Sequence, residues 1–320
     1  MRSTVLAAAA AAMALSAVPA CAASDREVTI DGGKAPLHGA ILAPDKPATG
    51  PAVLIIAGSG PTDRDSNSAI PGVKPNTLKQ IAEGLAGQGI VSLRFDKRGV
   101  GASAPALTQE ADLRFANFID DAAAWAGFLS AQKGVTCVVV LGHSEGAQIA
   151  AFVAERVKAC GLVSVSGAGR PAADLLKTQL KAAPMPDDLR ATALADVDVL
   201  AGGHTVDDPP PALAALFRPS VQPYLISWLA LDPAVEIKAV KAPVLILQGS
   251  TDLQVSVDDA QRLAKARPDA KLLVLDGVNH VLKPAPSDRA ANIATYADPD
   301  LPLDPRVVPA MAAFVKSVAR

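Results

Sequence analysis

A chain of 320 residues, half of them hydrophobic, is long enough to bury one large core. Its net charge of −2, its lack of a Lys/Arg cluster and its aromatic content of 3% argue against nucleic acid as a partner. No Cys/His spacing resembles a zinc site, so we expect neither a metal nor a cofactor.

The first 23 residues have the pattern of a signal peptide. Arg2 supplies a positive charge, an apolar run follows from Val5 to Val18, and small residues permit cleavage after Ala22 or Ala23. The run is too short to span a bilayer, so we expect no transmembrane anchor. A lipid anchor on Cys21 is the alternative. In both cases the mature chain, about residues 24–320, is expected to be periplasmic or secreted.

Apolar, β-branched runs alternate with helical patterns along most of the mature chain. The runs predict strands near residues 27–30, 37–43, 52–56, 91–95, 137–141, 161–165, 244–248 and 271–275. Helices are predicted near residues 75–87, 115–131, 145–157, 257–266 and 305–318. The alternation from residue 52 onward is typical of a parallel sheet covered by helices, and the two opening strands indicate an antiparallel hairpin at its edge.

The alternation breaks at about residues 169–240, where a helical cap insertion is predicted. This segment is rich in Pro and Gly, with helical patterns near residues 174–181, 189–199 and 211–217. Leu225, Trp228 and Leu229 follow at helical spacing. They could line a substrate pocket, with Trp228 as the main contact, or they could simply pack the cap against the sheet.

The segment Gly142-His143-Ser144-Glu145-Gly146 directly follows a strand pattern and opens a helix pattern. In a G-x-S-x-G turn of this kind, small residues let the backbone reverse so that the serine is exposed at the carboxyl edge of the sheet. The helix that begins there directs its free N–H groups toward an oxyanion. We therefore predict Ser144 as a nucleophile, with an ordinary glycine-flanked turn as the alternative.

Of the four histidines, His280 is the best candidate for a base that activates Ser144. It follows a strand pattern and a short loop, which places it at the carboxyl end of a strand, as Ser144 is. His38 lies in an N-terminal strand pattern, His204 falls in a loop pattern, and the side chain of His143 is expected to point away from the serine.

Asp252 is the predicted orienting acid. It comes three residues after the buried-strand pattern that ends at Gly249. Capping of the helix near residues 257–266 is the alternative role, but Ser256 is better placed for it. The order Ser144, Asp252, His280 is the nucleophile–acid–base order of the α/β-hydrolase fold.

The N–H groups of Glu145 and Ser59 are the predicted oxyanion-hole donors. Glu145 follows the serine, and Ser59 lies in the loop after the strand near residues 52–56. Gly58 and Gly60 would let this loop approach a substrate closely. A phosphate-binding loop is disfavoured because no Lys-Ser/Thr pair follows, and a plain glycine turn is the other alternative.

Four segments together carry a resemblance to a known family: Gly58–Asp65 (GSGPTDRD), Arg94–Ser103 (RFDKRGVGAS), Gly142–Gly146 (GHSEG) and Phe217–Tyr224 (FRPSVQPY). In this order they resemble the bacterial α/β-hydrolases related to the EstD-type carboxylesterases. The resemblance implies hydrolysis of small carboxylic esters through an acyl-enzyme, with Ser144, Asp252 and His280 as the triad. It also implies an oxyanion loop at residues 58–65.

Other functions remain open at this point. A peptidase, thioesterase or lactonase would use the same triad, because the serine turn sets the acyl-transfer chemistry but not the leaving group. A non-catalytic binding protein on the same scaffold is the third possibility, although all three triad residues are present.

Cys137 and Cys160 are candidates for a disulfide. Each lies at the amino end of a predicted strand, and these strands are expected to be parallel neighbours. Neighbouring strands lie about 4.8 Å apart, which is within the range that a disulfide bridges. Two buried free thiols are the alternative.

Overall fold

The computed structural model describes residues 25–46 and 49–319. The predicted signal peptide, residues 1–23, and Cys21 therefore lie outside the described residues. Among the helices that are described, none is both long and apolar enough to cross a membrane.

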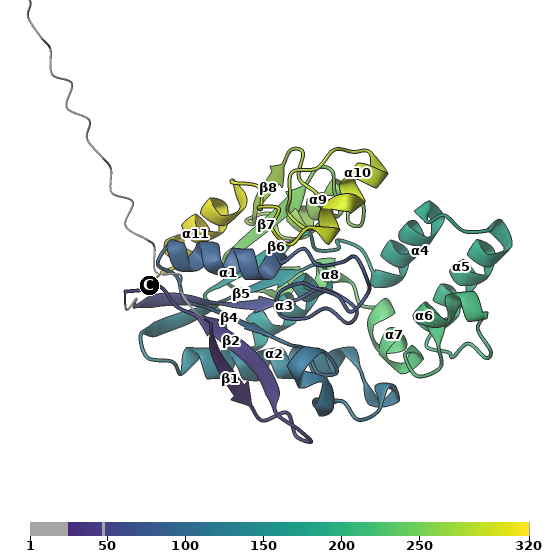
Figure 1. The fold of residues 1–320 in the computed structure, drawn as a ribbon, viewed down its shortest axis with the longest axis horizontal. Coiled ribbons are helices and arrows are strands. Elements are labelled where there is room, and N and C mark those ends of the chain that lie inside the picture. The colour runs from purple at the N-terminus through teal and green to yellow at the C-terminus, as the bar shows by residue number, and fades with distance from the viewer. Residues whose placement is uncertain (1–24, 47–48, 320) are drawn as a thin grey trace, which may run out of the picture.

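A mostly parallel sheet of eight strands forms the centre of the fold (Figure 1). The order across the sheet is β1-β2-β4-β3-β5-β6-β7-β8, and β2 is antiparallel to both of its neighbours. The predicted parallel sheet with an antiparallel hairpin at its edge is confirmed. The strands are β1 (Arg26–Ile30), β2 (Leu37–Leu42), β3 (Gly50–Ile56), β4 (Ser92–Phe95), β5 (Val135–His143), β6 (Gly161–Val165), β7 (Val244–Gly249) and β8 (Lys271–Leu275).

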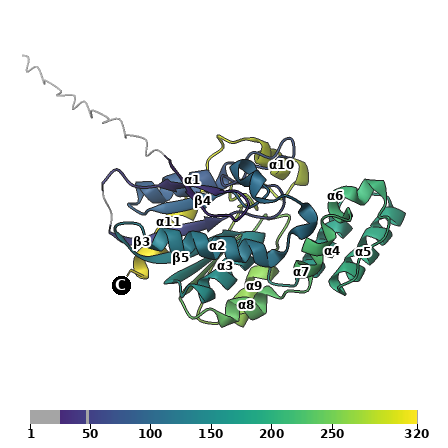
Figure 2. The same cartoon turned by 90° about the horizontal axis from the view of Figure 1, so that it is seen from below.

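Helices cover both faces of this sheet (Figures 1 and 2). On one face, α1 (Thr77–Gly87) and α11 (Val307–Ser317) share a core with strand residues such as Val53 and Val139. The other face packs residues such as Leu54 and Val140 against α2 (Phe115–Ser130), α3 (Glu145–Arg156), α8 (Pro233–Ala239) and α9 (Val257–Ala266). Successive strand residues point to opposite faces, so a sheet covered on both faces needs continuous apolar runs.

Four helices form a lobe beside the sheet (Figures 1 and 2). They are α4 (Ala172–Ala182), α5 (Asp187–Ala201), α6 (Ala214–Phe217) and α7 (Gln222–Leu229), and they occupy the stretch for which the sequence predicts a cap. The helix α7 contains Leu225, Trp228 and Leu229, for which the sequence indicates helical spacing, whereas the short helices α8 and α10 (Arg289–Ala294) have no counterpart in the sequence prediction.

Two partly buried ion pairs tie the loop that follows β3 to β4 and to the loop after β4. Arg94 on β4 pairs with Asp65 at 2.9 Å, and Arg64 pairs with Asp96 at 3.0 Å. These residues belong to the two motif segments at 58–65 and 94–103. Because β3 and β4 are parallel neighbours, their loops leave the same edge of the sheet, and the paired charges hold them together there.

A disulfide joins Cys137, near the start of β5, to Cys160, which immediately precedes β6. The two Cα atoms lie 6.0 Å apart, on strands that are parallel neighbours, as the sequence suggests. The bond lies at the end of β5 opposite to Ser144, so it joins strands without contributing to the serine's surroundings.

Candidate active site

Ser144 occupies a strained turn between β5 and α3. Its backbone has φ 57° and ψ −122°, a conformation that costs a non-glycine residue about 1–3 kcal/mol. Glycine is required on both sides: a Cβ on Gly142 would lie 1.9 Å from the carbonyl oxygen of Gly146, and one on Gly146 would lie 2.4 Å from that of Ile56. The Ser144 N–H donates to Val165 O at 2.9 Å, which fixes the turn to β6.

His280 and Asp252 form a buried hydrogen-bonded pair at the same edge of the sheet. His280 Nδ1 lies 2.8 Å from Asp252 Oδ2, and the other carboxylate oxygen accepts the N–H groups of Gln254 and Val255. With Nδ1 donating to the acid, Nε2 carries the free lone pair. The hydrogen bond to Asp252 therefore holds the imidazole ring in place and favours the tautomer with an unprotonated Nε2.

The electrostatics keep Asp252 ionised. Burial alone would raise the pKa of Asp252, but the facing His280 and the hydrogen bonds outweigh burial, so this pKa lies below its ordinary value. In the described part of the chain, no hydrogen bond joins Ser144 Oγ to His280 Nε2. Hydrogen bonds of this kind are often long before a substrate binds.

His143 has a contact that the sequence did not predict. Its Nε2 donates to the backbone carbonyl of His280 at 2.8 Å, and its ring lies beside the His280 ring. Burial, followed by the neighbouring His280, lowers the pKa of His143 to about 4, so this residue stays neutral near pH 7. His38 on β2 and the exposed His204 lie away from the cavity.

A cavity of about 300 Å³ opens beside Ser144 and His280. The loop between β3 and α1 forms much of its wall, and Gln254, Val281 and Tyr296 also line it. Among the residues that the structure describes, no Asp, Glu, Lys or Arg lines this cavity. Elsewhere among the described residues, no group of three His, Cys, Asp or Glu side chains is arranged to hold a metal ion.

Trp228, the predicted substrate contact, does not line this cavity. The Trp228 ring stacks on Phe115 with the ring centroids 6.0 Å apart, and its Nε1 donates to Gln148 Oε1 at 2.8 Å. Leu225 and Leu229 are buried in the core that includes α2 and α3. The apolar face of α7 therefore serves the packing of the lobe, which was the alternative interpretation.

The predicted oxyanion-hole residues surround Ser144. Gly58, Ser59 and Gly60 line the cavity, and a Cβ on Gly58 would lie 3.3 Å from the Ser144 Cβ. Glu145 is the first residue of α3, where a backbone N–H has no partner within the helix. The loop after β3 and the start of α3 therefore meet at the serine from two sides.

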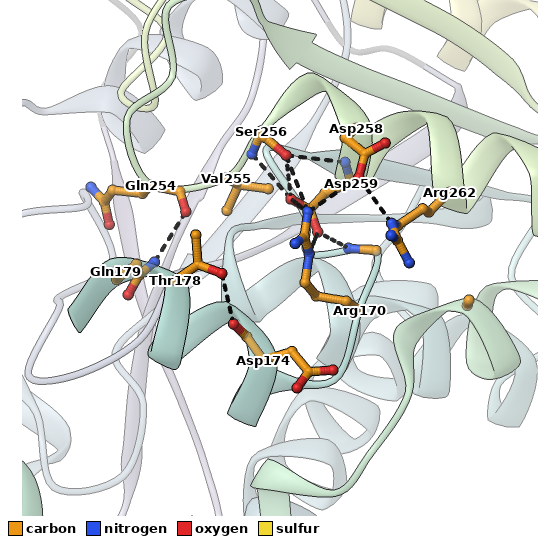
Figure 3. A network of polar contacts seen from close by, with 12 residues as sticks. Arg170, Asp174, Thr178, Gln179, Gln254, Val255, Ser256, Asp258, Asp259 and Arg262 are labelled. Atoms are coloured by element: carbon orange, nitrogen blue, oxygen red, sulfur yellow. Dashed lines mark hydrogen bonds and ion pairs between the residues drawn. The ribbon is translucent and has the colours of Figure 1, made fainter. Parts of the chain in front are cut away.

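The loop that follows Asp252 is anchored to α4 (Figure 3). Ser256 caps α9 in a capping box with Asp259, which leaves Asp252 free for His280 as predicted. Arg170, near the start of α4, donates to Asp259 at 2.7 Å. Gln179 on α4 donates to the carbonyl of Gln254, a cavity residue, at 3.1 Å.

Comparison with known proteins supports a relation to hydrolases. The model of the alpha/beta hydrolase family matches residues 53–295. Esterase EstD from Thermotoga maritima is 31% identical over an alignment of 274 residues, and the match covers 81% of this chain and 60% of that protein. The chain thus spans about 60% of the length of this relative.

Two solved structures share the fold. The Est1E structure from Butyrivibrio proteoclasticus with ferulic acid bound has a TM-score of 0.59 at 16% identity, and the similarity covers 91% of this chain and 96% of that one. Proline iminopeptidase from Mycobacterium smegmatis has a TM-score of 0.55 at 18% identity, with 92% and 98% covered. The family match extends over most of the chain and includes both Ser144 and His280. The chain therefore belongs to the alpha/beta hydrolase family.

Proposed function

We propose that this protein is a carboxylesterase with Ser144 as nucleophile, His280 as general base and Asp252 as orienting acid. The observation that carries the proposal is the 2.8 Å hydrogen bond from His280 to Asp252 at the cavity that Ser144 lines. The similarity to Esterase EstD supports an ester as the substrate.

The positions of these groups support the following reaction. Ser144 Oγ attacks the ester carbonyl carbon while His280 Nε2 takes its proton. The N–H groups of Ser59 and Glu145 stabilise the oxyanion, and each donor of this kind contributes about 10²–10³-fold to the rate. Collapse of the intermediate expels the alcohol, which His280 protonates. A water activated by His280 then hydrolyses the acyl-enzyme at Ser144.

The uncharged cavity favours neutral esters over aminoacyl substrates. An aminopeptidase must bind a protonated amine, and taking that charge out of water without a carboxylate partner is costly. The lining here combines hydroxyl groups, such as those of Ser66 and Tyr296, with apolar side chains, such as Val73. The volume of about 300 Å³ is at the small end for a ligand cavity, which favours short acyl groups.

Turnover of p-nitrophenyl acetate, butyrate and longer esters, compared with acyl thioesters and aminoacyl-p-nitroanilides, tests this function. We expect the short esters to be the best substrates and a fluorophosphonate to label Ser144 stoichiometrically. Ser144→Ala should keep its thermal midpoint and lose several orders of magnitude in kcat. Full activity of Ser144→Ala would refute the role of the serine, and faster turnover of the anilides would refute the substrate class.

We also propose that the enzyme acts outside the cytoplasm. The predicted signal peptide at residues 1–23 and the Cys137–Cys160 disulfide both support an oxidising compartment. The mass of the mature protein from its own host would separate cleavage after Ala22 or Ala23 from acylation at Cys21. A full-length chain recovered from the cytoplasm would contradict the proposal.

A further inference from the structure

Lys97 is a buried cation that contacts both segments of the candidate oxyanion hole. Only 2% of the residue is exposed, and it follows β4 by two positions. Its Nζ donates to the backbone carbonyl of Gly58 at 2.5 Å and lies 4.9 Å from the centre of the Phe118 ring. Burying an ammonium group costs free energy unless it is paired and hydrogen-bonded. The contacts that Lys97 makes in the core therefore need an explanation.

The bond from Lys97 determines which way the Gly58–Ser59 peptide faces. In a trans peptide the C=O and the N–H point in opposite directions, and the described residues include no cis peptide bond. The carbonyl of Gly58 points to Lys97, so the N–H of Ser59 points away from Lys97. No other donor to the Gly58 carbonyl is found among the described residues. Without Lys97, a flipped peptide would direct a carbonyl oxygen, rather than an N–H, at the developing oxyanion.

Lys97 also contacts the residue that supplies the second N–H. Its Nζ lies 3.6 Å from Glu145 Oε2, and both side chains are only 1% exposed. The other oxygen of Glu145 accepts a hydrogen bond from the hydroxyl of Tyr224 on α7. Burial, and then the charge of Glu145, raises the pKa of Tyr224 well above its ordinary value, so this hydroxyl keeps its proton.

We propose that Lys97 is the positioning residue of the oxyanion hole, because it binds the carbonyl of Gly58 and the carboxylate of Glu145 at the same time. This inference rests on the proposed esterase function. Lys97 touches no substrate atom. It acts through the main chain of Ser59, which follows Gly58, and of Glu145, the two residues that supply the N–H groups. The charge of Glu145 compensates the cation in the core, and Tyr224 connects the pair to the lobe.

Lys97→Met tests this role, with Arg98→Met as the matched control. Arg98 is the neighbouring cation, and it pairs with Asp121 on α2 rather than with the oxyanion loop. For Lys97→Met we expect kcat to fall about 10²-fold, with KM within about threefold of wild type, because an oxyanion-hole donor acts on the transition state. A boronic acid that forms a tetrahedral adduct on Ser144 should bind more weakly by a similar factor. Arg98→Met should keep the wild-type kcat.

Several results would overturn the proposal. One is a folded Lys97→Met enzyme with wild-type kcat, and another is a loss of activity that only follows the unfolded fraction. If Lys97→Met does not fold, the double variant Lys97→Met/Glu145→Gln removes both buried charges and should show the same loss of kcat. Failure of both variants to fold would assign Lys97 to the stability of the core instead. Wild-type protein that neither turns over esters nor reacts with a fluorophosphonate would refute the esterase function itself, separately from the role of Lys97.

Discussion

Glu236→Gln should stabilise the protein at alkaline pH and leave its stability unchanged in acid. Glu236 on α8 is only 8% exposed, and its Oε2 accepts a hydrogen bond from Gln148 Nε2 at 2.9 Å. Burial raises the pKa of Glu236 from its ordinary value of 4.5 to about 7, the bond from Gln148 opposes this rise, and the charge of Asp232 adds to it. The site therefore favours the protonated acid, which glutamine mimics without a charge.

The direction of the stability change with pH follows from the raised pKa of Glu236. Below about pH 4.5 the carboxyl group is protonated in both the folded and the unfolded chain, so the substitution changes little. As the pH rises toward 7, the unfolded chain ionises first, and the folded chain loses the corresponding stability. At about 1.4 kcal/mol per pKa unit, the difference between 4.5 and about 7 amounts to roughly 3 kcal/mol above pH 7. Glu236→Gln removes this loss.

Urea unfolding of wild type and Glu236→Gln at pH 4.5, 6 and 8 measures the effect. The free energy of unfolding of the variant should exceed that of wild type by about 3 kcal/mol at pH 8 and by little at pH 4.5. Glu155→Gln, which changes an exposed carboxylate on α3, is the control and should show no such trend. A Glu236→Gln effect that is absent, or equal at all three pH values, would refute the reasoning.

Two further predictions concern the base and the disulfide. His280→Ala should abolish ester hydrolysis while His204→Ala keeps it, as p-nitrophenyl ester turnover will show; an essential His204 would contradict the assignment. In unreduced mature protein, Cys137 and Cys160 should resist alkylation, and replacing both by alanine should lower the free energy of unfolding by about 3 kcal/mol, because the bond closes a loop with a sequence separation of 23. Two alkylated thiols in the mass spectrum would disprove the bond.

The sheet could be predicted from sequence because each strand carries its own signal. A strand covered on both faces is a continuous apolar run, and the turns at the carboxyl edge are marked by Gly, Ser or Asp. Ser144, Asp252 and His280 each follow a continuous apolar run of this kind. Because the strands are parallel, the ends of these runs lie at the same edge of the sheet, and this brings the three residues together.

Contacts between distant segments could not be predicted in the same way. The helical spacing of Trp228 identifies an apolar face but not the neighbour that covers it, which is Phe115. The helices α8 and α10 are seven and six residues long, and helices of this length depend on tertiary packing. The ion pair between Lys97 and Glu145 likewise joins residues with no local sequence signal between them.

The motif segments are rich in charged residues, yet the cavity beside Ser144 that they help to form is lined by uncharged ones. Arg64, Arg94 and Lys97 are all buried or nearly so, and each is paired with a carboxylate, yet none of them lines the cavity beside Ser144. Burying paired charges gains little stability, because desolvation offsets most of the attraction. Their hydrogen bonds and ion pairs instead fix the conformation of the main chain, because these contacts with carbonyl and carboxylate groups are directional and apolar contacts are not. The loop after β3 can therefore present backbone N–H groups to a substrate while the surface that the substrate contacts stays uncharged.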